Sequence, residues 1–145
     1  MSKIARTLAR PRFDIMENQP AKKKQVLIVE DEVDLALSYK ELLEQHGFSV
    51  STAPNGVLAL KHILNKEVDA VICDLKLPQL EGDMFYVTVE RLKPHLCGRF
   101  IFITGMAQNP KFQPFIDRMA SRMLLKPVST EKLLETLNAL FDRPA

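Results

Sequence analysis

The stretch Val26-Leu27-Ile28-Val29-Glu30-Asp31 decides the fold of this chain. Its first four residues form a short continuous apolar run, which is typical of a β-strand buried on both faces. Two carboxylates follow directly where this strand should end. Three later apolar runs also end at a polar or charged residue, and these residues are Asp74, Thr104 and Lys126. Because a strand buried on both faces needs a covering layer on each side, the segments between the runs should be helices.

The folded part alternates five predicted strands with five predicted helices. Strands are expected at 26–29, 48–52, 68–73, 99–104 and 123–125, and helices at 32–46, 57–65, 83–93, between 110 and 121, and from a cap at 129 or 130 to 141. The buried stripes should include Val33 in the first helix and Leu64 in the second. Strands joined through helices must run parallel. The pattern predicts an α/β fold with a doubly wound five-stranded parallel sheet.

The composition is that of a globular protein with one core. The chain has 145 residues, of which 46% are hydrophobic and 26% are charged. No apolar run approaches the roughly 20 residues of a membrane-spanning helix. The two cysteines cannot form a disulfide framework or a four-ligand zinc site. With no signal-peptide pattern at the N-terminus, the sequence predicts a cytoplasmic protein.

The charges are unevenly distributed along the chain. Residues 1–24 contain seven Lys or Arg residues against two acidic residues, whereas residues 25–145 contain 13 against 16. This predicts a basic, flexible N-terminal tail at 1–24 and a folded domain at 25–145. The composition of residues 1–24 favours a segment that is simply solvated. Contact of Lys22-Lys23-Lys24 with nucleic acid or acidic lipid stays an alternative. No direct DNA binding is expected, because no aromatic residues lie among the lysines.

The residues at the predicted strand ends form one group. In a parallel sheet, functional side chains gather beyond the carboxyl ends of the strands. Glu30, Asp31 and Asp74 should therefore lie close to Thr104 and Lys126. Two carboxylates about 4 Å apart repel by roughly 4 kcal/mol at an effective dielectric constant near 20, so three require a proton or a cation among them. An all-oxygen acidic site favours Mg²⁺.

The same residues suit phosphoryl transfer. An aspartate can act as a nucleophile and form an aspartyl-phosphate. The phosphoryl oxygens then need neutralising groups, which a metal, an ammonium and a hydroxyl provide. Asp74 is the expected nucleophile, and Asp31, Lys126 and Thr104 are the expected supporting residues.

Five separated motifs resemble those of response-regulator receiver domains of two-component signalling, including chemotaxis regulators. They are Val29-Glu30-Asp31-Glu32, Asp74-Leu75-Lys76-Leu77-Pro78, Gly82, Ile103-Thr104-Gly105 and Lys126-Pro127. The resemblance covers about residues 25–142. It implies a flavodoxin-like receiver fold with strand order 2-1-3-4-5 and a cis peptide bond before Pro127. It also implies that the domain catalyses only its own phosphorylation and dephosphorylation and is not otherwise an enzyme.

The resemblance assigns a role to each site residue. Asp74 would accept a phosphoryl group from a histidine kinase or a histidine phosphotransfer protein. Mg²⁺ would be held by Asp31, Asp74 and the backbone carbonyl of Lys76, with Glu30 helping directly or through water. Thr104 and Lys126 would bind the phosphoryl oxygens. The domain would then change its protein–protein contacts.

Three departures from the family pattern stand out. Met123 lies where the family usually has a switch aromatic, and methionine has neither a ring nor a hydroxyl. Lys76 adds a positive charge two residues after the nucleophile, which predicts a changed phosphate lifetime. Pro110 and Pro114 lie where the fourth helix should begin, and Pro114 should shorten or displace that helix.

Several functional alternatives remain at this point. The leading one is a receiver domain without its own effector domain, and the others within the family are a segment of a hybrid histidine kinase or an interaction module that is never phosphorylated. A haloacid-dehalogenase-type phosphatase is disfavoured, since Lys76 occupies the place of its second acid. A nucleotide-binding Rossmann domain is disfavoured because residues 30–34 lack a glycine-rich loop.

Overall fold

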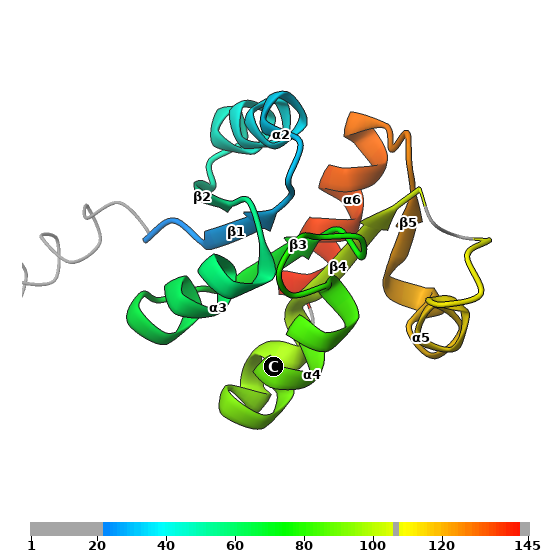
Figure 1. Ribbon diagram of the computed structural model, residues 1–145. Coiled ribbons are helices and arrows are strands. Elements are labelled where there is room, and N and C mark those ends of the chain that lie inside the picture. Colours follow the sequence, from blue (N-terminus) through cyan, green and yellow to red (C-terminus); the bar gives the residue numbers. More distant parts are fainter. Residues whose placement is uncertain (1–21, 106–107, 143–145) are drawn as a thin grey trace, which may run out of the picture.

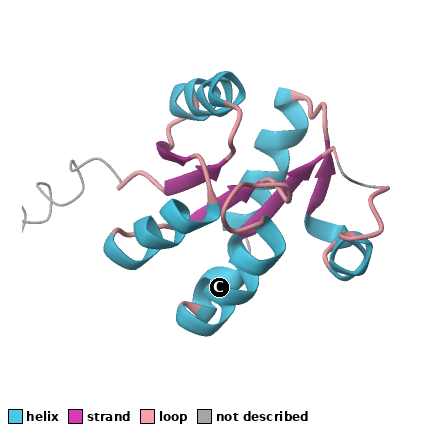
Figure 2. Ribbon diagram, viewed as in Figure 1, coloured by secondary structure: helices cyan, strands magenta, loops and turns pink. Residues whose placement is uncertain are grey.

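The computed structural model describes residues 22–105 and 108–142 of the chain (Figure 1). Strands alternate with helices along these residues (Figure 2). The strands are β1 (Gln25–Val29), β2 (Ser49–Ala53), β3 (Ala70–Cys73), β4 (Phe100–Thr104) and β5 (Met123–Leu125). The α-helices are α2 (Val33–Gln45), α3 (Gly56–Asn65), α4 (Gly82–Leu92), α5 (Gln113–Arg118) and α6 (Thr130–Phe141), and the 3₁₀ helices are η1 (Pro94–Arg99) and η2 (Ala120–Arg122).

The strands form one parallel sheet in the order β2-β1-β3-β4-β5. The predicted α/β class, the doubly wound architecture and the strand order are confirmed. β1 and β3 lie in the middle of the sheet, and their register pairs Val29 with Cys73, the last residue of each strand. The residues that follow these two strands therefore emerge side by side at the carboxyl edge of the sheet.

Each face of the sheet packs against its own set of helices (Figure 1). On one face α2 and α6 contribute Ala36, Leu43, Leu133 and Leu137 to a core that includes Ile28 and Ile72. On the other face α3 and α4 contribute residues such as Ile63 and Phe85 to a core around Leu27 and Phe100. Alternate residues of a strand point to opposite faces, which explains why neighbours such as Leu27 and Ile28 belong to different cores.

The helix termini are defined by local chemistry. The Asn55 side chain accepts a hydrogen bond from the Leu58 N–H at 2.8 Å and caps α3. Ser129, one of the two predicted caps, accepts from the Lys132 N–H at 3.1 Å and caps α6. Pro114 lies in the first turn of α5, where its missing N–H removes no intrahelical bond. The helix has only six residues and begins at Gln113, which agrees with the prediction of a shortened or displaced helix, although Pro114 itself lies where a proline is tolerated.

Some element-level predictions were wrong. Val33 and Leu64 were expected in buried stripes, but their side chains are 65% and 50% exposed. Both lie in a terminal turn of a helix, where the apolar spacing continues but few other residues pack against these two side chains. The third strand begins at Ala70 and not at residue 68, because the Asp69 carboxylate accepts the Gln25 N–H at 2.7 Å. The 3₁₀ helix η1 after Pro94 was not predicted.

The prediction of a basic, flexible tail at 1–24 falls mostly outside the described residues. Within them, Lys22 pairs with Glu67 at 2.8 Å, and both side chains are largely exposed. None of the described helices is long and apolar enough to cross a lipid bilayer.

Candidate functional site

The site begins where β1 and β3 end. The Asp74 N–H donates to the Val29 carbonyl at 3.0 Å, which continues the strand pairing by one residue. The Glu30 N–H donates to the Ala53 carbonyl at 3.0 Å on the other side. These bonds fix the backbones of Glu30 and Asp74 next to each other, and Asp31 follows directly.

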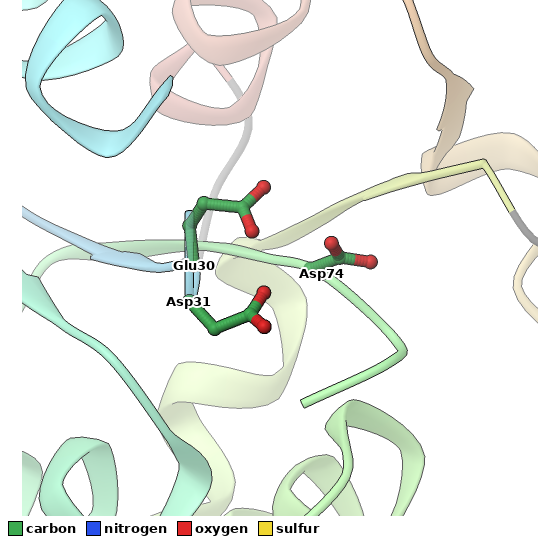
Figure 3. A group of neighbouring side chains, drawn as sticks. All are labelled: Glu30, Asp31 and Asp74. Atoms are coloured by element: carbon green, nitrogen blue, oxygen red, sulfur yellow. The ribbon is translucent and has the colours of Figure 1, made fainter. Parts of the chain in front are cut away.

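Three carboxylates meet at this edge of the sheet. One oxygen of each of Glu30, Asp31 and Asp74 lies within 4.8 Å of the others. Figure 3 shows Glu30 and Asp31 extending from the end of β1 toward the side of Asp74. Glu30 and Asp74 are buried, at 4% and 7% exposure, whereas Asp31 is exposed. The clustering of these acids at the carboxyl edge therefore agrees with what the strand pattern predicts.

Lys126 supplies the cation that the acidic cluster requires. Its Nζ donates to Glu30 Oε1 and to Asp74 Oδ2, at 2.7 Å each. The Lys126 N–H also donates to the Thr104 carbonyl at 3.0 Å, and the Lys126–Pro127 peptide bond is cis, as predicted. The backbone of Lys126 is thus tied to the end of β4 while its ammonium bridges the ends of β1 and β3.

The Lys126 bridge affects the pKa of Lys126 and also that of Glu30. Burial alone would lower the pKa of Lys126, but hydrogen bonds to Asp74 and Glu30 outweigh burial and raise this pKa well above its usual value. Burial raises the pKa of the Glu30 carboxyl, and the hydrogen bond from Lys126 offsets part of that rise. Lys126 is therefore a permanent cation, and it partly compensates the charge of a buried acid.

Asp74 faces an open pocket of about 550 Å³. The pocket is lined by Asp31, Glu32, Asp74, Lys76, Leu77, Pro78, Glu81, Gly105 and Lys126. While Asp74 Oδ2 is bound by Lys126, Asp74 Oδ1 accepts a 3.3 Å hydrogen bond from the Lys76 N–H. This pair of contacts holds the Asp74 carboxylate by both oxygens at the wall of a pocket that is open to solvent.

The start of α4 lies against the backbone that carries Asp74, and the residue before it, Glu81, lines the pocket. The Gly82 N–H donates to the Leu75 carbonyl at 2.8 Å, and a side chain at position 82 would collide with the backbone carbonyl of Asp74. Only glycine permits this approach, which explains why the predicted motif needs Gly82 eight residues after Asp74. The same approach places Glu81 against the pocket.

The other predicted site residues differ in position. Thr104 is fully buried at the end of β4, and among the described residues it is Gly105, not Thr104, that lines the pocket. Lys76 is exposed and lines the pocket, so its charge is close to the expected reaction. The roles of Thr104 and Lys126 toward a phosphoryl group, and of the Lys76 carbonyl toward a metal, remain predictions.

Two residues of the pocket region were not predicted. Glu81 forms one wall, and Lys111, from the segment between β4 and α5, pairs with it at 2.6 Å. Glu81 precedes the glycine that begins α4, so its position was available in the sequence. Nothing in the sequence links Glu81 with Lys111.

The residues present fit a magnesium ion. Mg²⁺ takes oxygen ligands and retains several waters, and the cluster offers three carboxylates beside an open pocket. Histidine and cysteine, which would favour a softer metal, are not part of any such cluster in the described residues.

A five-stranded doubly wound sheet with acids and a lysine at its carboxyl edge defines an α/β domain with a charged site at the ends of its strands. Comparison with known proteins makes this specific: the chain matches the response regulator receiver domain over residues 26–138. It therefore belongs to this family. Receiver domains are phosphoryl-accepting modules of two-component signalling, and they bind Mg²⁺ at an acidic pocket.

Relatives occur both as single domains and within larger proteins. The chain is 29% identical over 122 residues to the probable chemotaxis protein CheY of Rhizobium etli, covering 83% of this chain and 95% of that protein. It is 28% identical over 120 residues to the sensor kinase CckA of Brucella abortus, covering 81% of this chain. This chain spans only 12% of that kinase and 28% of the Escherichia coli regulatory protein GlrR.

Solved structures share the fold. A CheY-like receiver domain from Methanospirillum hungatei matches with a TM-score of 0.75 and 28% identity, covering 83% of this chain and 95% of that one. The regulator TrrA of Thermotoga maritima, solved with Mg²⁺ and beryllofluoride, matches with a TM-score of 0.69 and 26% identity, covering 81% and 98%.

Proposed function

We propose that this domain accepts a phosphoryl group on Asp74, in a Mg²⁺-dependent reaction, from the phosphohistidine of a histidine kinase or a histidine phosphotransfer protein. The observation that carries the proposal is the Asp74 carboxylate, held by Lys126 and the Lys76 N–H at the wall of an open pocket beside two further acids. Receipt of the phosphoryl group would change the contacts that the domain makes with other proteins in the cytoplasm.

The transfer is a simple displacement. An oxygen of Asp74 forms a bond to phosphorus while the phosphorus–nitrogen bond of the phosphohistidine breaks, and the electron pair of that bond stays on the histidine nitrogen. Nothing is oxidised or reduced. Asp74 Oδ1, with its longer and weaker hydrogen bond, is the better candidate for the attacking oxygen.

The chain's own groups would hold and neutralise the transferred group. Lys126, already an ammonium beside Asp74, would bind a phosphoryl oxygen, and Thr104 would bind another. Glu30, Asp31, Asp74 and the Lys76 carbonyl would hold the metal ion. When bound, Mg²⁺ supplies charge neutralisation of the phosphoryl oxygens.

The partner class is supported by the relatives. One is a sensor kinase that contains a segment similar to this chain, and another is a chemotaxis regulator that this chain nearly covers. The name of the sensor kinase supports a kinase as the partner class.

Intact-mass measurement after incubation with acetyl phosphate tests the proposal. With Mg²⁺ the wild-type protein should gain the mass of one phosphoryl group, and removal of Mg²⁺ by EDTA should abolish the gain. Asp74→Ala should gain nothing, and Asp31→Asn should gain far less. Asp34→Asn is the matched control, because Asp34 is an exposed acid of α2 three residues from Asp31.

The contrary result is also informative. A wild-type protein that folds but shows neither a mass gain nor any Mg²⁺-dependent spectral change with beryllofluoride would refute phosphoryl acceptance. The domain would then act as a receiver-like interaction module.

A further inference from the structure

An ion pair crosses the edge of the pocket between two segments far apart in the sequence. Lys111 Nζ lies 2.6 Å from Glu81 Oε1, with the two side chains 62% and 29% exposed. Glu81 is the cap residue of α4, and Lys111 lies two residues before the start of α5. The pair therefore joins the wall of the pocket to the segment that leads into α5.

Glu81 is held at the pocket by its backbone, and the charge of its carboxylate is incompletely compensated. Gly82 is held against the backbone of Asp74 and Leu75, so the backbone of Glu81 cannot move away from the pocket without moving α4. Its second oxygen, Oε2, is buried and has no hydrogen-bond partner within the part of the chain that the structure describes. Lys111 provides the counter-charge that Glu81 has in this state.

The Lys111 side of the pair is connected to α5. The next residue, Phe112, is 1% exposed and packs in the core, and its carbonyl accepts the Ile116 N–H at 2.9 Å in the first turn of α5. The Lys111 ammonium lies 5.5 Å from the centroid of the Phe112 ring. A change in the position of Lys111 would therefore alter the surroundings of Phe112, the buried residue just before α5.

Phosphorylation would change the charge balance of the pocket. Four of the lining residues are acidic, namely Asp31, Glu32, Asp74 and Glu81, and two are lysines, Lys76 and Lys126. A phosphoryl group carries a charge of about −1.5 to −2, whereas the Asp74 carboxylate that it modifies carries −1. Lys126, which pairs with Glu30 and Asp74, would hold one phosphoryl oxygen but is shared with Glu30. The added negative charge therefore acts on the Lys111–Glu81 pair, repelling one partner and attracting the other.

We infer that Lys111 is an exchangeable counter-ion: it pairs with Glu81 in the unphosphorylated protein and moves toward the phosphoryl group on Asp74 once that group is present. Lys111 would act as a positioning residue that couples the pocket to Phe112 and α5. An exposed ion pair is weak and is easily exchanged for a partner of higher charge. The inference rests on the proposed function and extends it to the route by which the pocket affects the rest of the domain.

The test uses beryllofluoride with Mg²⁺ as the probe. Calorimetry would give its affinity for the wild type and for Lys111→Met, Glu81→Gln and Arg118→Met. Arg118 is the matched control, because its 3.5 Å exposed ion pair with Glu90 joins α5 to α4 without lining the pocket. Lys111→Met should weaken binding by about three- to tenfold, and Glu81→Gln should strengthen it by a similar factor. Arg118→Met should stay within about twofold of the wild type.

NMR supplies a readout that a purely structural role would not change. The Phe112 ring marks the resting position of Lys111, so the ε-methylene signals of Lys111 should lose their ring-current shift when beryllofluoride binds. The amide signals of α5 should shift in the wild type and much less in Lys111→Met. Lys111→Arg, which keeps the charge, should restore both properties and covers the case in which Lys111→Met folds poorly.

The two proposals fail in different ways. If the wild type binds no beryllofluoride, the proposed function is wrong and the inference falls with it. If the wild type binds but its Lys111 signals do not move, or Lys111→Met binds as tightly as the wild type, only the inference is overturned.

Discussion

Lys126 is the residue on which the charge balance of the pocket depends. Glu30 is 4% exposed and Lys126 is 21% exposed along its side chain, so the pair is largely removed from water. Lys126→Met should leave the buried Glu30 carboxylate without its counter-charge. Loss of one partner from a buried pair costs about 3–5 kcal/mol, and the partial exposure of Lys126 reduces the expected loss to roughly 1–3 kcal/mol of unfolding free energy.

The pH dependence of that loss identifies its cause. Burial raises the pKa of Glu30, and removing Lys126 should raise that pKa further. A raised carboxyl pKa means that protonation favours the folded state, so the loss is largest at neutral pH and shrinks as the pH falls toward the Glu30 pKa. Urea unfolding at pH 7 and pH 5 measures this. An equal loss at both values would attribute the effect to packing and not to charge.

Lys76 is expected to control how long the phosphoryl group persists. Its exposed side chain lines the pocket two residues after Asp74, and its four-carbon stem and ammonium would hinder the approach of water to a phosphoryl group on Asp74. Lys76→Asn should therefore speed the loss of the phosphoryl group by about two- to tenfold, because water reaches Asp74 more freely. Phosphate release after removal of acetyl phosphate measures the rate. Lys66→Asn is the control, because Lys66 is exposed at the end of α3, before β3 begins. An unchanged rate in Lys76→Asn would refute the role of Lys76 in phosphoryl lifetime.

At the residue scale, the sequence predicts those site residues whose positions the strands determine. Glu30, Asp31 and Asp74 follow buried strands directly, so the direction of the strands is enough to bring them together. The Glu81–Lys111 pair joins residues 30 apart whose segments show no shared pattern. Such a pair depends on side-chain rotamers and on the path of an irregular segment, which apolar periodicity does not encode.

At the scale of single elements, the start of α4 is the most constrained part of the site. Gly82 lies so close to the Asp74 carbonyl that a methyl group there would force α4 away from the strand end. Gly82→Ala should reduce the free energy of unfolding by roughly 1–3 kcal/mol, as overpacking does. It should also weaken beryllofluoride binding, because Glu81 and the Asp74 backbone would move apart. Urea unfolding and calorimetry measure the two effects.

Gly98 offers the control for that substitution. It lies in η1, and a methyl group built there has nothing within 4 Å. Gly98→Ala should change stability by less than about 1 kcal/mol and leave ligand binding unaltered. If Gly82→Ala were as mild as Gly98→Ala, the close approach of α4 to Asp74 would not be needed for the pocket.

Element types were predictable from the sequence, but their bounds and faces were less so. The strand predicted at 26–29 is confirmed, and the helix expected to be shortened or displaced at Pro114 is the six-residue α5. The exposure of Val33 and the late start of β3 depend on which other parts of the folded chain pack against each element. Apolar spacing states which residues share a face, not how much of that face the rest of the chain covers.

At the scale of the whole molecule, the topology explains why the site is acidic. The order β2-β1-β3-β4-β5 places β1 and β3 side by side, although the first helix, β2 and the second helix separate them in the sequence. The acids that follow these strands are therefore forced together by folding. Two of them have Lys126 as a counter-ion, whereas the third, Asp31, has no ion pair among the residues that the structure describes and adds repulsion unless a metal ion binds.

This arrangement predicts opposite effects of one substitution with and without magnesium. In EDTA, Asp31→Asn should raise the free energy of unfolding by about 0.5–1 kcal/mol, because it removes the charge of an exposed carboxylate within 4.8 Å of two others.

With Mg²⁺ the wild type should gain stability with rising metal concentration, by about 2.7 kcal/mol when the free ion exceeds its dissociation constant a hundredfold. Asp31→Asn should lose most of this gain, and Asp34→Asn should keep it. Urea unfolding across a Mg²⁺ series gives both comparisons, and equal Mg²⁺ stabilisation of wild type and Asp31→Asn would exclude Asp31 as a ligand. The Asp31 carboxylate would thus lower the stability of the metal-free domain and raise the stability of the Mg²⁺-bound domain.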